Sequence, residues 1–273
     1  MPGLNTLTEN AFKRRLRTGE QQRGFFSTLG SASVLEALAS WGFDWAVIDT
    51  EHGQSDLAAV LEQLRVLENL GVEPVVRPTS NDPALVKRLL DLGARTLLFP
   101  SISTAADAAA AVAATRYPSA VHPLGIRGVS GISRAAGYGR NPGYLRAAHD
   151  SLCVLVQIET VEGIGNLDEI ARVDGVDGVF IGPSDLSAAL GYLGDAQHAD
   201  VQASVDGAFA RLRELGVPSG YLTVNTAEMS RRLAAGAADP DARIAFVAVS
   251  TDVSILNLGL AALEGALAVT IRK

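Results

Sequence analysis

Cysteine is nearly absent from this sequence of 273 residues. Cys153 is the only one, so the chain can form neither an internal disulfide nor a cluster of thiolate metal ligands. The cytoplasm is therefore the expected location. Met1 to Glu20 carries charges throughout without an apolar core, which disfavours a secretory signal peptide. No apolar run approaches the roughly 20 residues needed to cross a bilayer, and no membrane partner is expected.

Positive charge is also scarce. The formal net charge is −7, and no basic stripe is available to neutralise phosphates, so nucleic acid is not an expected partner. Only three lysines occur: Lys13 and Lys87 in segments of helical pattern, and Lys273 at the last position. A mechanism that forms an imine on a buried lysine therefore has very few candidates.

The sequence does contain a repeated alternation of short apolar runs and Ala/Leu-rich segments of helical period. The runs are apolar at consecutive positions, as in Val154-Leu155-Val156, which is typical of parallel strands buried on both faces. Eight strands are predicted, at Gly24–Leu29, Trp45–Asp49, Glu73–Arg77, Thr96–Pro100, Leu152–Glu159, Gly178–Gly182, Gly220–Val224 and Ile244–Val249. Eight such units predict a (β/α)8 barrel. An open doubly wound sheet is the alternative, but no glycine-rich phosphate fingerprint follows the first strand.

A single domain over residues 1–273 is expected, because a βα barrel commonly takes roughly 250 residues. A short helix at Thr8–Arg17 is predicted to cap the bottom of the barrel. The segment Tyr117–Asp150, rich in Gly, Pro, Arg and Tyr, is too long for an ordinary connection between strands four and five. We interpret this insertion as a lid or a subunit contact.

Two acidic residues, Glu159 and Asp185, stand at the ends of neighbouring predicted strands. Both are expected at the carboxyl-terminal face of the barrel, where βα-barrel enzymes in general have their active sites. Carboxylates this close repel each other unless they share a proton or a cation. Oxygen ligands completed by water or substrate favour Mg²⁺ or Mn²⁺, with Co²⁺ also possible, over zinc. The alternative is structural: Glu159 caps the next helix and Asp185 closes a turn.

Other polar residues also stand at predicted strand ends. His52 follows the second strand in a stretch with two acids, and we interpret it as a general base rather than a structural histidine. Arg77 ends the third strand, where a permanently charged guanidinium suits a carboxylate or a developing oxyanion; a rim salt bridge is the alternative. The turn Gly182-Pro183-Ser184-Asp185 can direct backbone N–H groups at an anion.

Together these segments resemble the HpcH/HpaI family of metal-dependent class II pyruvate aldolases, in the same order and over nearly the whole chain. The segments are Phe43-Asp44-Trp45, Asp49-Thr50-Glu51-His52, Val76-Arg77-Pro78, Leu90-Asp91-Leu92-Gly93-Ala94, Gln157-Ile158-Glu159-Thr160 and Gly182-Pro183-Ser184-Asp185-Leu186. The resemblance implies a barrel of the phosphoenolpyruvate/pyruvate type, usually a homohexamer. It further implies reversible cleavage of 4-hydroxy-2-oxoacids to pyruvate, or a related 2-oxoacid, and an aldehyde.

The resemblance also implies roles for individual residues. His52 is the base, Arg77 stabilises the transition state, and Asp91 raises the basicity of the histidine. The binding roles fall to metal ligands Glu159 and Asp185, and to Gln157, Ser184, Asp185 and Arg77 around the pyruvyl unit. The sequence departs from the family's commoner pattern at Thr50, where glycine is frequent, so the specificity for the aldehyde is not implied.

Three other functions stay open from the sequence. A citrate-lyase-β-like acyl-CoA lyase has a similar barrel and acidic pair, although that pattern lacks a histidine at the position of His52. Oxaloacetate decarboxylation uses the same chemistry in the same site. A non-catalytic binding barrel is the third.

Overall fold

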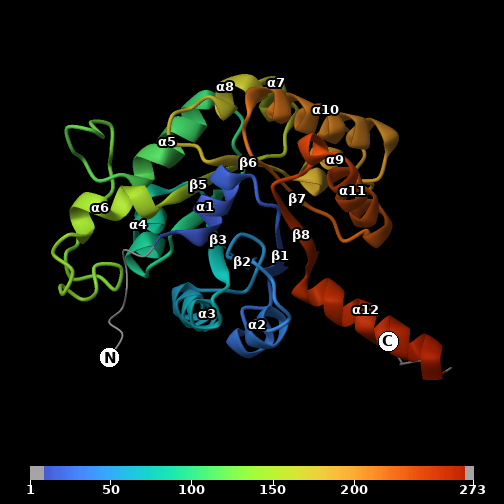
Figure 1. Ribbon diagram of the computed structural model, residues 1–273, viewed down its shortest axis with the longest axis horizontal. Coiled ribbons are helices and arrows are strands. Elements are labelled where there is room, and N and C mark those ends of the chain that lie inside the picture. Colours follow the sequence, from blue (N-terminus) through green and yellow to red (C-terminus); the bar gives the residue numbers. More distant parts are fainter. Residues whose placement is uncertain (1–8, 268–273) are drawn as a thin grey trace.

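The computed structural model describes residues 9–267 and contains a closed barrel of eight parallel strands in the order β1 to β8 (Figure 1). The strands are β1 Gln22–Ser27, β2 Trp45–Asp49, β3 Glu73–Arg77, β4 Thr96–Phe99, β5 Cys153–Ile158, β6 Gly178–Ile181, β7 Ser219–Leu222 and β8 Phe246–Thr251. The predicted (β/α)8 barrel is confirmed. β2 and β3 have the predicted bounds, whereas β8 lies two residues later, beside an irregularity in its pairing with Gly24 and Phe26 of β1.

Helices surround the barrel and mostly alternate with its strands. They are α1 Ala11–Thr18, α2 Ala32–Ala39, α3 Leu57–Leu70, α4 Pro83–Asp91, α5 Ala105–Thr115, α6 Tyr144–Ser151, α7 Val161–Gly165, α8 Leu167–Ala171, α9 Pro183–Ala189, α10 Ala199–Leu215, α11 Thr226–Ala238 and α12 Asp252–Leu267, with a 3-10 turn at Pro240–Ala242. The side chain of Asp56 caps the start of α3 by accepting from the Ala59 N–H, and Gly71 ends α3 in the left-handed conformation at φ 71°. Local capping chemistry thus sets helix boundaries that the sequence pattern already indicated.

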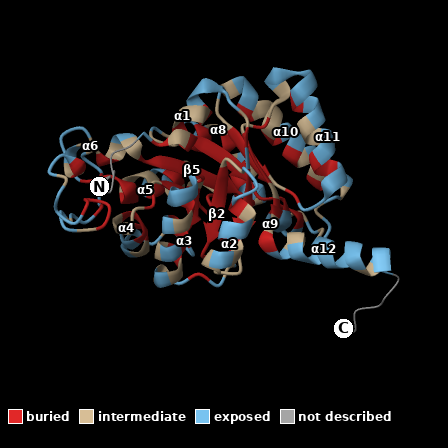
Figure 2. Cartoon of the chain, turned by 60° about the horizontal axis from the view of Figure 1, so that its bottom comes forward, coloured by how far each residue is buried: buried red, intermediate tan, exposed pale blue. Residues whose placement is uncertain are grey.

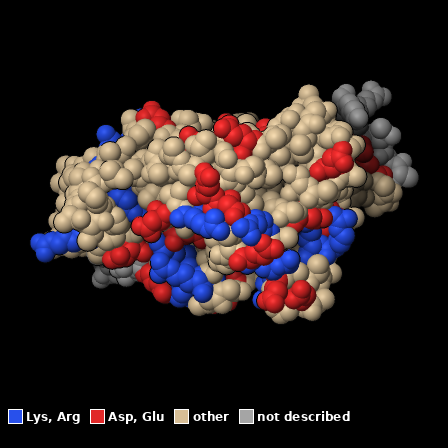
Figure 3. All heavy atoms as spheres, turned by 90° about the horizontal axis from the view of Figure 1, so that it is seen from above, with Lys and Arg blue, Asp and Glu red and all other residues tan. Residues whose placement is uncertain are grey.

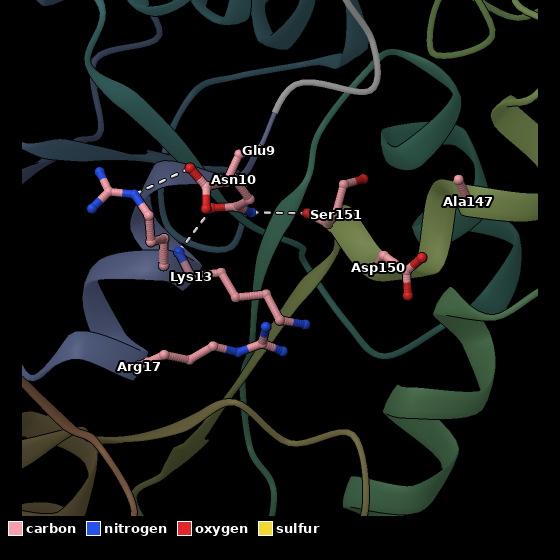
Figure 4. Close-up of a pocket in the computed structure, with 8 residues that line it drawn as sticks. Glu9, Asn10, Lys13, Arg17, Ala147, Asp150 and Ser151 are labelled. Carbon is pink, nitrogen blue, oxygen red and sulfur yellow. Dashed lines mark hydrogen bonds and ion pairs between the residues drawn. The ribbon is translucent and has the colours of Figure 1, made fainter.

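α1 closes the bottom of the barrel. The ring of Phe12 is fully buried and packs edge-on against Trp45 at 5.7 Å and Phe246 at 5.4 Å. Asn10 caps α1 by accepting from the Lys13 N–H at 2.9 Å and donates to the Ser151 carbonyl at 3.0 Å, beside a cavity of about 400 Å³ (Figure 4). The predicted start of this helix at Thr8 lies outside the described residues.

The long segment between strands four and five leaves the barrel at its amino end. Residues 116–143 follow α5, not β4, so they belong to the connection that leads into β5. Arg127 pairs with Asp91 at 3.2 Å, and Arg134 donates to the Leu92 carbonyl at 2.8 Å, both at the end of α4. Because helices of a βα barrel end at the amino face, this segment does not cover the mouth of its own barrel, contrary to the lid interpretation.

The described surface carries mixed charge and one protruding apolar helix. On the face shown in Figure 3, basic and acidic side chains are interspersed rather than gathered by sign. α12 extends away from the barrel with its side chains largely exposed, whereas the strands are buried (Figure 2). Among residues 9–267, no helix has both the length and the apolar character that a membrane span requires.

Candidate active site

A cavity of about 420 Å³ opens at the carboxyl ends of the strands. Its walls include five residues singled out from the sequence: His52, Arg77, Gln157, Ser184 and Asp185. Residues of β1, β2, β6, β7 and β8 also line the cavity, together with the connections at residues 194–197 and 223–225. This is the face where a parallel βα barrel places substrate, so one cavity unites strand ends that lie far apart in the sequence.

Arg77 is held in place by a buried carboxylate. Asp49 is directly opposite Arg77 in the β2–β3 register. Arg77 Nε donates to Asp49 Oδ1 at 2.9 Å and Nη2 donates to Oδ2 at 2.8 Å, with the Asp49 side chain fully buried. Thr50 donates its hydroxyl to the Arg77 carbonyl at 2.7 Å. Two parallel charge-assisted bonds fix the guanidinium plane and leave the remaining nitrogen, Nη1, for other partners.

Glu51 lies beside that remaining nitrogen. Its Oε2 atom is 3.0 Å from Arg77 Nη1 and 4.0 Å from His52 Nε2. Burial raises the pKa of Glu51 most strongly; Arg77 opposes the rise, and the nearby charge of Glu159 adds to it. The His52 side chain is 64% exposed at the cavity edge, where it can reach substrate and exchange protons with solvent. This arrangement places a guanidinium, a carboxyl and an imidazole next to one another.

Glu159 is buried and held by backbone and side-chain donors. Its Oε1 atom accepts from the Ser101 N–H at 2.8 Å and the Ser101 hydroxyl at 3.2 Å, and Oε2 accepts from Gln157 Nε2. Ser101 adopts φ 56°, a left-handed conformation that costs energy for a residue with a side chain. Burial raises the pKa of Glu159 in spite of these donors, and the charge of Asp185 raises it further.

Asp185 lies in the first turn of α9, across from Glu159. Within residues 9–267 its carboxylate makes no hydrogen bond or ion pair. Gly182 lies against the Glu159 side chain: a Cβ atom there would lie 2.8 Å from Glu159 Oε2 and 3.1 Å from Gln157 Nε2. Glycine is therefore needed for the Glu159 side chain to occupy this position beside the end of β6.

The structural alternative for the acidic pair is not supported. Thr160, not Glu159, caps α7, since its hydroxyl accepts from the Gly163 N–H at 2.9 Å. A cation fits the pair better, because it would neutralise a buried carboxylate whose pKa is raised and a second one that has no hydrogen-bonding partner among residues 9–267. No group of three or more His, Cys, Asp or Glu gathers as a metal cage in the described part of the chain. Two carboxylates that leave positions for water and substrate suit Mg²⁺ or Mn²⁺.

Asp91 is not part of this cluster within one chain. It is the last residue of α4, at the amino end of the barrel, and it pairs with Arg127 of the segment 116–143. His52 lies at the opposite end, after β2. The role of Asp91 towards the histidine stays a prediction, and one chain does not provide the contact.

Sequence reasoning assigned no role to Asp49, Glu51 or Ser101. The two acids were visible as part of the segment around His52, and their position at a strand end was the available signal. Ser101 had none, because its contact depends on the pairing of β4 with β5 and on a backbone conformation that serine rarely adopts.

The sequence matches the profile of a known protein family. The sequence profile described as HpcH/HpaI aldolase/citrate lyase matches residues 22–253. The chain belongs to this family. The predicted family is thus confirmed, over a range that includes every strand of the barrel.

Named relatives of the family cover nearly the whole chain. A pyruvate aldolase of Rhizobium etli is 46% identical over 257 residues, 94% of this chain and 97% of the relative. A 4-hydroxy-2-oxo-heptane-1,7-dioate aldolase of Salmonella dublin is 47% identical over 256 residues, 93% of each chain. The crystal structure of an HpcH/HpaI aldolase/citrate lyase family protein from Burkholderia cenocepacia is 42% identical. It superposes with a TM-score of 0.87 over 94% of this chain and 99% of that chain.

Proposed function

We propose that the protein is a divalent-metal-dependent aldolase that reversibly cleaves 4-hydroxy-2-oxoacids to pyruvate, or a related 2-oxoacid, and an aldehyde. One observation carries the proposal. Asp185, His52 and Arg77 line one cavity, and Asp49 fixes the Arg77 guanidinium. Buried Glu159 is hydrogen-bonded to the lining residue Gln157, and the charge of Asp185 raises its pKa. The names of relatives at 46% and 47% identity support it.

The chain's own residues divide the chemistry. Gln157 and the backbone N–H groups of Ser184 and Asp185, at the start of α9, hold the pyruvyl unit. Arg77 stabilises negative charge that develops on the 2-oxo oxygen. His52 accepts the proton of the 4-hydroxyl group during cleavage, directly or through water, and it takes a C3 proton of pyruvate in the reverse direction.

Glu159 and Asp185 would hold the divalent cation, with Mg²⁺ or Mn²⁺ favoured and Co²⁺ possible. When bound, the cation supplies Lewis-acid polarisation of the 2-oxoacid. Ser101 and Gln157 orient Glu159 for that task through the hydrogen bonds described above.

Replacing His52 with alanine tests the assignment of the base. We expect kcat/KM for cleavage of a 4-hydroxy-2-oxoacid to fall about 10²- to 10⁴-fold, because general base catalysis contributes about that much. The melting temperature should not change, since the side chain is 64% exposed. The measurements are steady-state cleavage kinetics and a thermal melt.

The matched control is His122→Ala, a histidine in the segment at the amino end of the barrel. It should cleave at the wild-type rate. Retention of wild-type cleavage by the His52 variant would remove this residue from the mechanism.

An acyl-CoA lyase of the citrate lyase type is the alternative, because the family includes citrate lyases. The aldolase proposal expects a CoA thioester to be inert in the same assay. Oxaloacetate decarboxylation is expected as a side activity of the same site, since it develops the same charge on the 2-oxo oxygen. A cytoplasmic location also stays a prediction.

We also propose that the chain forms a homo-oligomer, a hexamer according to the family resemblance. The buried Asp252 anchors α12 by accepting from the Thr28 hydroxyl at 2.7 Å and the Leu29 N–H at 3.0 Å. Beyond this anchor, the helix exposes several leucines: Leu256, Leu258, Leu260, Leu263 and Leu267. A second copy of the chain is the occupant that we propose for this apolar helix.

Light scattering after size exclusion tests the assembly. Wild type should elute well above the monomer mass, and Leu260→Glu with Leu263→Glu should shift it towards smaller species. Leu193→Glu, at an exposed leucine outside α12, is the control and should leave the mass unchanged. A monomeric wild type at micromolar concentration would contradict the proposal.

A further inference from the structure

Two segments to which we assign no catalytic role line the cavity at the carboxyl ends of the strands, which we call the mouth cavity. Residues 194–197 connect α9 to α10, and residues 223–225 connect β7 to α11; both line the cavity. The groups that we assign to the pyruvyl unit stand on β5 and at the start of α9. Substrate atoms beyond the pyruvyl unit therefore extend towards the rest of the cavity lining. Residues 194–197 and 223–225 form a large part of that lining, and we call them the acceptor wall.

A single buried carboxylate lies behind the acceptor wall. Glu228, in the first turn of α11, is only 2% exposed and accepts four side-chain hydrogen bonds. Gln197 Nε2 and the Thr223 hydroxyl donate to Oε2, each at 2.7 Å. The Tyr221 hydroxyl donates to Oε1 at 2.7 Å and Arg232 Nε donates to Oε1 at 2.8 Å. Two of these donors, Gln197 and Thr223, are themselves cavity-lining residues from the two halves of the wall.

A second set of hydrogen bonds connects Glu228 to residues 194–197 through Arg232 and Gln202. Arg232 Nη2 donates to Gln202 Oε1 at 2.8 Å, and Gln202 Nε2 donates to the Ala196 carbonyl at 2.8 Å. A chain of hydrogen bonds therefore runs from Gln197 through Glu228, Arg232 and Gln202 to Ala196. Because residues 196 and 197 are neighbours in the sequence, this chain closes on itself. These bonds hold residues 196 and 197 against α10 and the first turn of α11.

Glu228 also fixes the second half of the wall through its backbone. Its N–H donates to Asn225 Oδ1 at 3.0 Å, and the Thr223 hydroxyl accepts from the Asn225 N–H at 3.1 Å. Burial alone would raise the pKa of Glu228, but the bonds from Arg232, Gln197, Thr223 and Tyr221 outweigh burial and lower it. The carboxylate is therefore charged at neutral pH.

We propose that Glu228 is a positioning residue that fixes the acceptor wall, and that this wall contacts the aldehyde half of the substrate. The inference rests on the proposed aldolase function. Its physical basis is pre-organisation: a wall already fixed before binding loses little freedom when the aldehyde arrives. Loosening the wall should weaken aldehyde binding while leaving the chemistry on pyruvate in place.

The experiment separates the two halves of the reaction. Pyruvate condensation is measured with a short aldehyde, glycolaldehyde, and a longer one, butanal, and pyruvate alone is followed by exchange of its C3 protons in D₂O. Gln197→Leu removes only the tether at the cavity. We expect the KM of this variant for butanal to rise about tenfold, because the net free energy of one hydrogen bond corresponds to about that factor in affinity. The KM for glycolaldehyde should rise less. The exchange rate and the KM for pyruvate should stay within about twofold of wild type.

Variants at the carboxylate itself distinguish positioning from simple structural damage. Glu228→Ala removes all four acceptor contacts and should raise the KM for butanal at least as much as Gln197→Leu. Glu228→Gln should restore a KM for butanal close to that of wild type, because the Gln197 amide can flip and its oxygen can accept a hydrogen bond from the new amide. Asp206→Asn is the control, since Asp206 bonds the same Arg232 at 2.8 Å from the exposed side and does not touch the wall.

The outcomes are separable. A wild type that neither exchanges pyruvate protons nor condenses aldehydes defeats the proposed function itself. An active wild type whose butanal KM is unchanged in Gln197→Leu overturns the role of the acceptor wall, even if Glu228→Ala fails to fold. A KM for pyruvate that rises in parallel also overturns it, because the whole site is then disturbed.

Discussion

Removal of divalent metal with EDTA is expected to abolish cleavage of 4-hydroxy-2-oxoacids, and added Mg²⁺, Mn²⁺ or Co²⁺ is expected to restore it. The reason is electrostatic. Glu159 is 4% exposed, its pKa is raised by burial and by Asp185, and Asp185 itself has no hydrogen-bonding partner among the described residues. A cation shared by the two carboxylates removes their repulsion and supplies the Lewis acid that the reaction needs. The measurement is a cleavage assay after chelation and after titration with each metal.

The control for this prediction addresses imine chemistry. Lys13 Nζ donates to the Leu152 carbonyl at 2.6 Å and pairs with Asp177 at the amino end of the barrel, and Lys87 lies on the outer helix α4. Neither lysine lines the mouth cavity, and Lys273 lies outside the described residues. Borohydride should therefore trap no pyruvate on the protein. Full activity in excess chelator, or a reduced pyruvate adduct, would refute the metal mechanism.

Replacement of Arg77 by alanine is expected to give the second large effect, on activity and on stability together. Loss of the charge that faces the 2-oxo oxygen should lower kcat about 10²- to 10³-fold, as for other oxyanion donors. The substitution also leaves the Asp49 carboxylate fully buried without its partner. Breaking a buried pair in this way costs about 3 kcal/mol of the free energy of unfolding. Steady-state kinetics and denaturant unfolding measure the two effects.

Two further variants sharpen this test. Arg77→Lys keeps a positive charge but cannot bond both Asp49 oxygens while facing the cavity, so it should recover part of the stability and little of the activity. Arg172→Ala removes an arginine whose side chain is 60% exposed and should change neither quantity measurably. An Arg77→Ala protein with near-normal kcat would show that Asp49 and Arg77 form only a structural pair.

The fold could be predicted because its determinants are local. Consecutive apolar residues define β2 and β3 at their observed bounds, and a capping Asp with a closing Gly defines α3. The apolar pattern predicts the start of β8 at Ile244, two residues before the strand begins at Phe246; Ala245 already donates to the Ser219 carbonyl of β7 and accepts from the Gln22 N–H of β1, both at 2.9 Å.

The site could be predicted only in part. Strand-end position was enough to single out Glu159, Asp185, Arg77 and His52, because a parallel barrel gathers all strand ends at one face. Contacts between strands were not accessible from one sequence. The bond from Ser101 to Glu159 requires β4 beside β5, and the network of Glu228 requires two connections that meet only in the folded chain.

The insertion illustrates the same limit. Its length and composition marked residues 117–150 as unusual, but their position after α5 rather than after β4 sends them to the amino end of the barrel. Whether a segment follows a strand or a helix therefore decides which face of the barrel it reaches. The exposed apolar side chains of the segment, such as Leu124 and Ile132, are compatible with the alternative interpretation as a subunit contact.

Anomalous scattering from a crystal soaked with Mn²⁺ and pyruvate tests the central claim most directly. The account predicts one strong peak at the mouth of the barrel, roughly 2 Å from a carboxylate oxygen of both Glu159 and Asp185, with pyruvate beside Arg77. A crystal with pyruvate bound and no peak between these two acids, or with the ion held by other side chains, would contradict it.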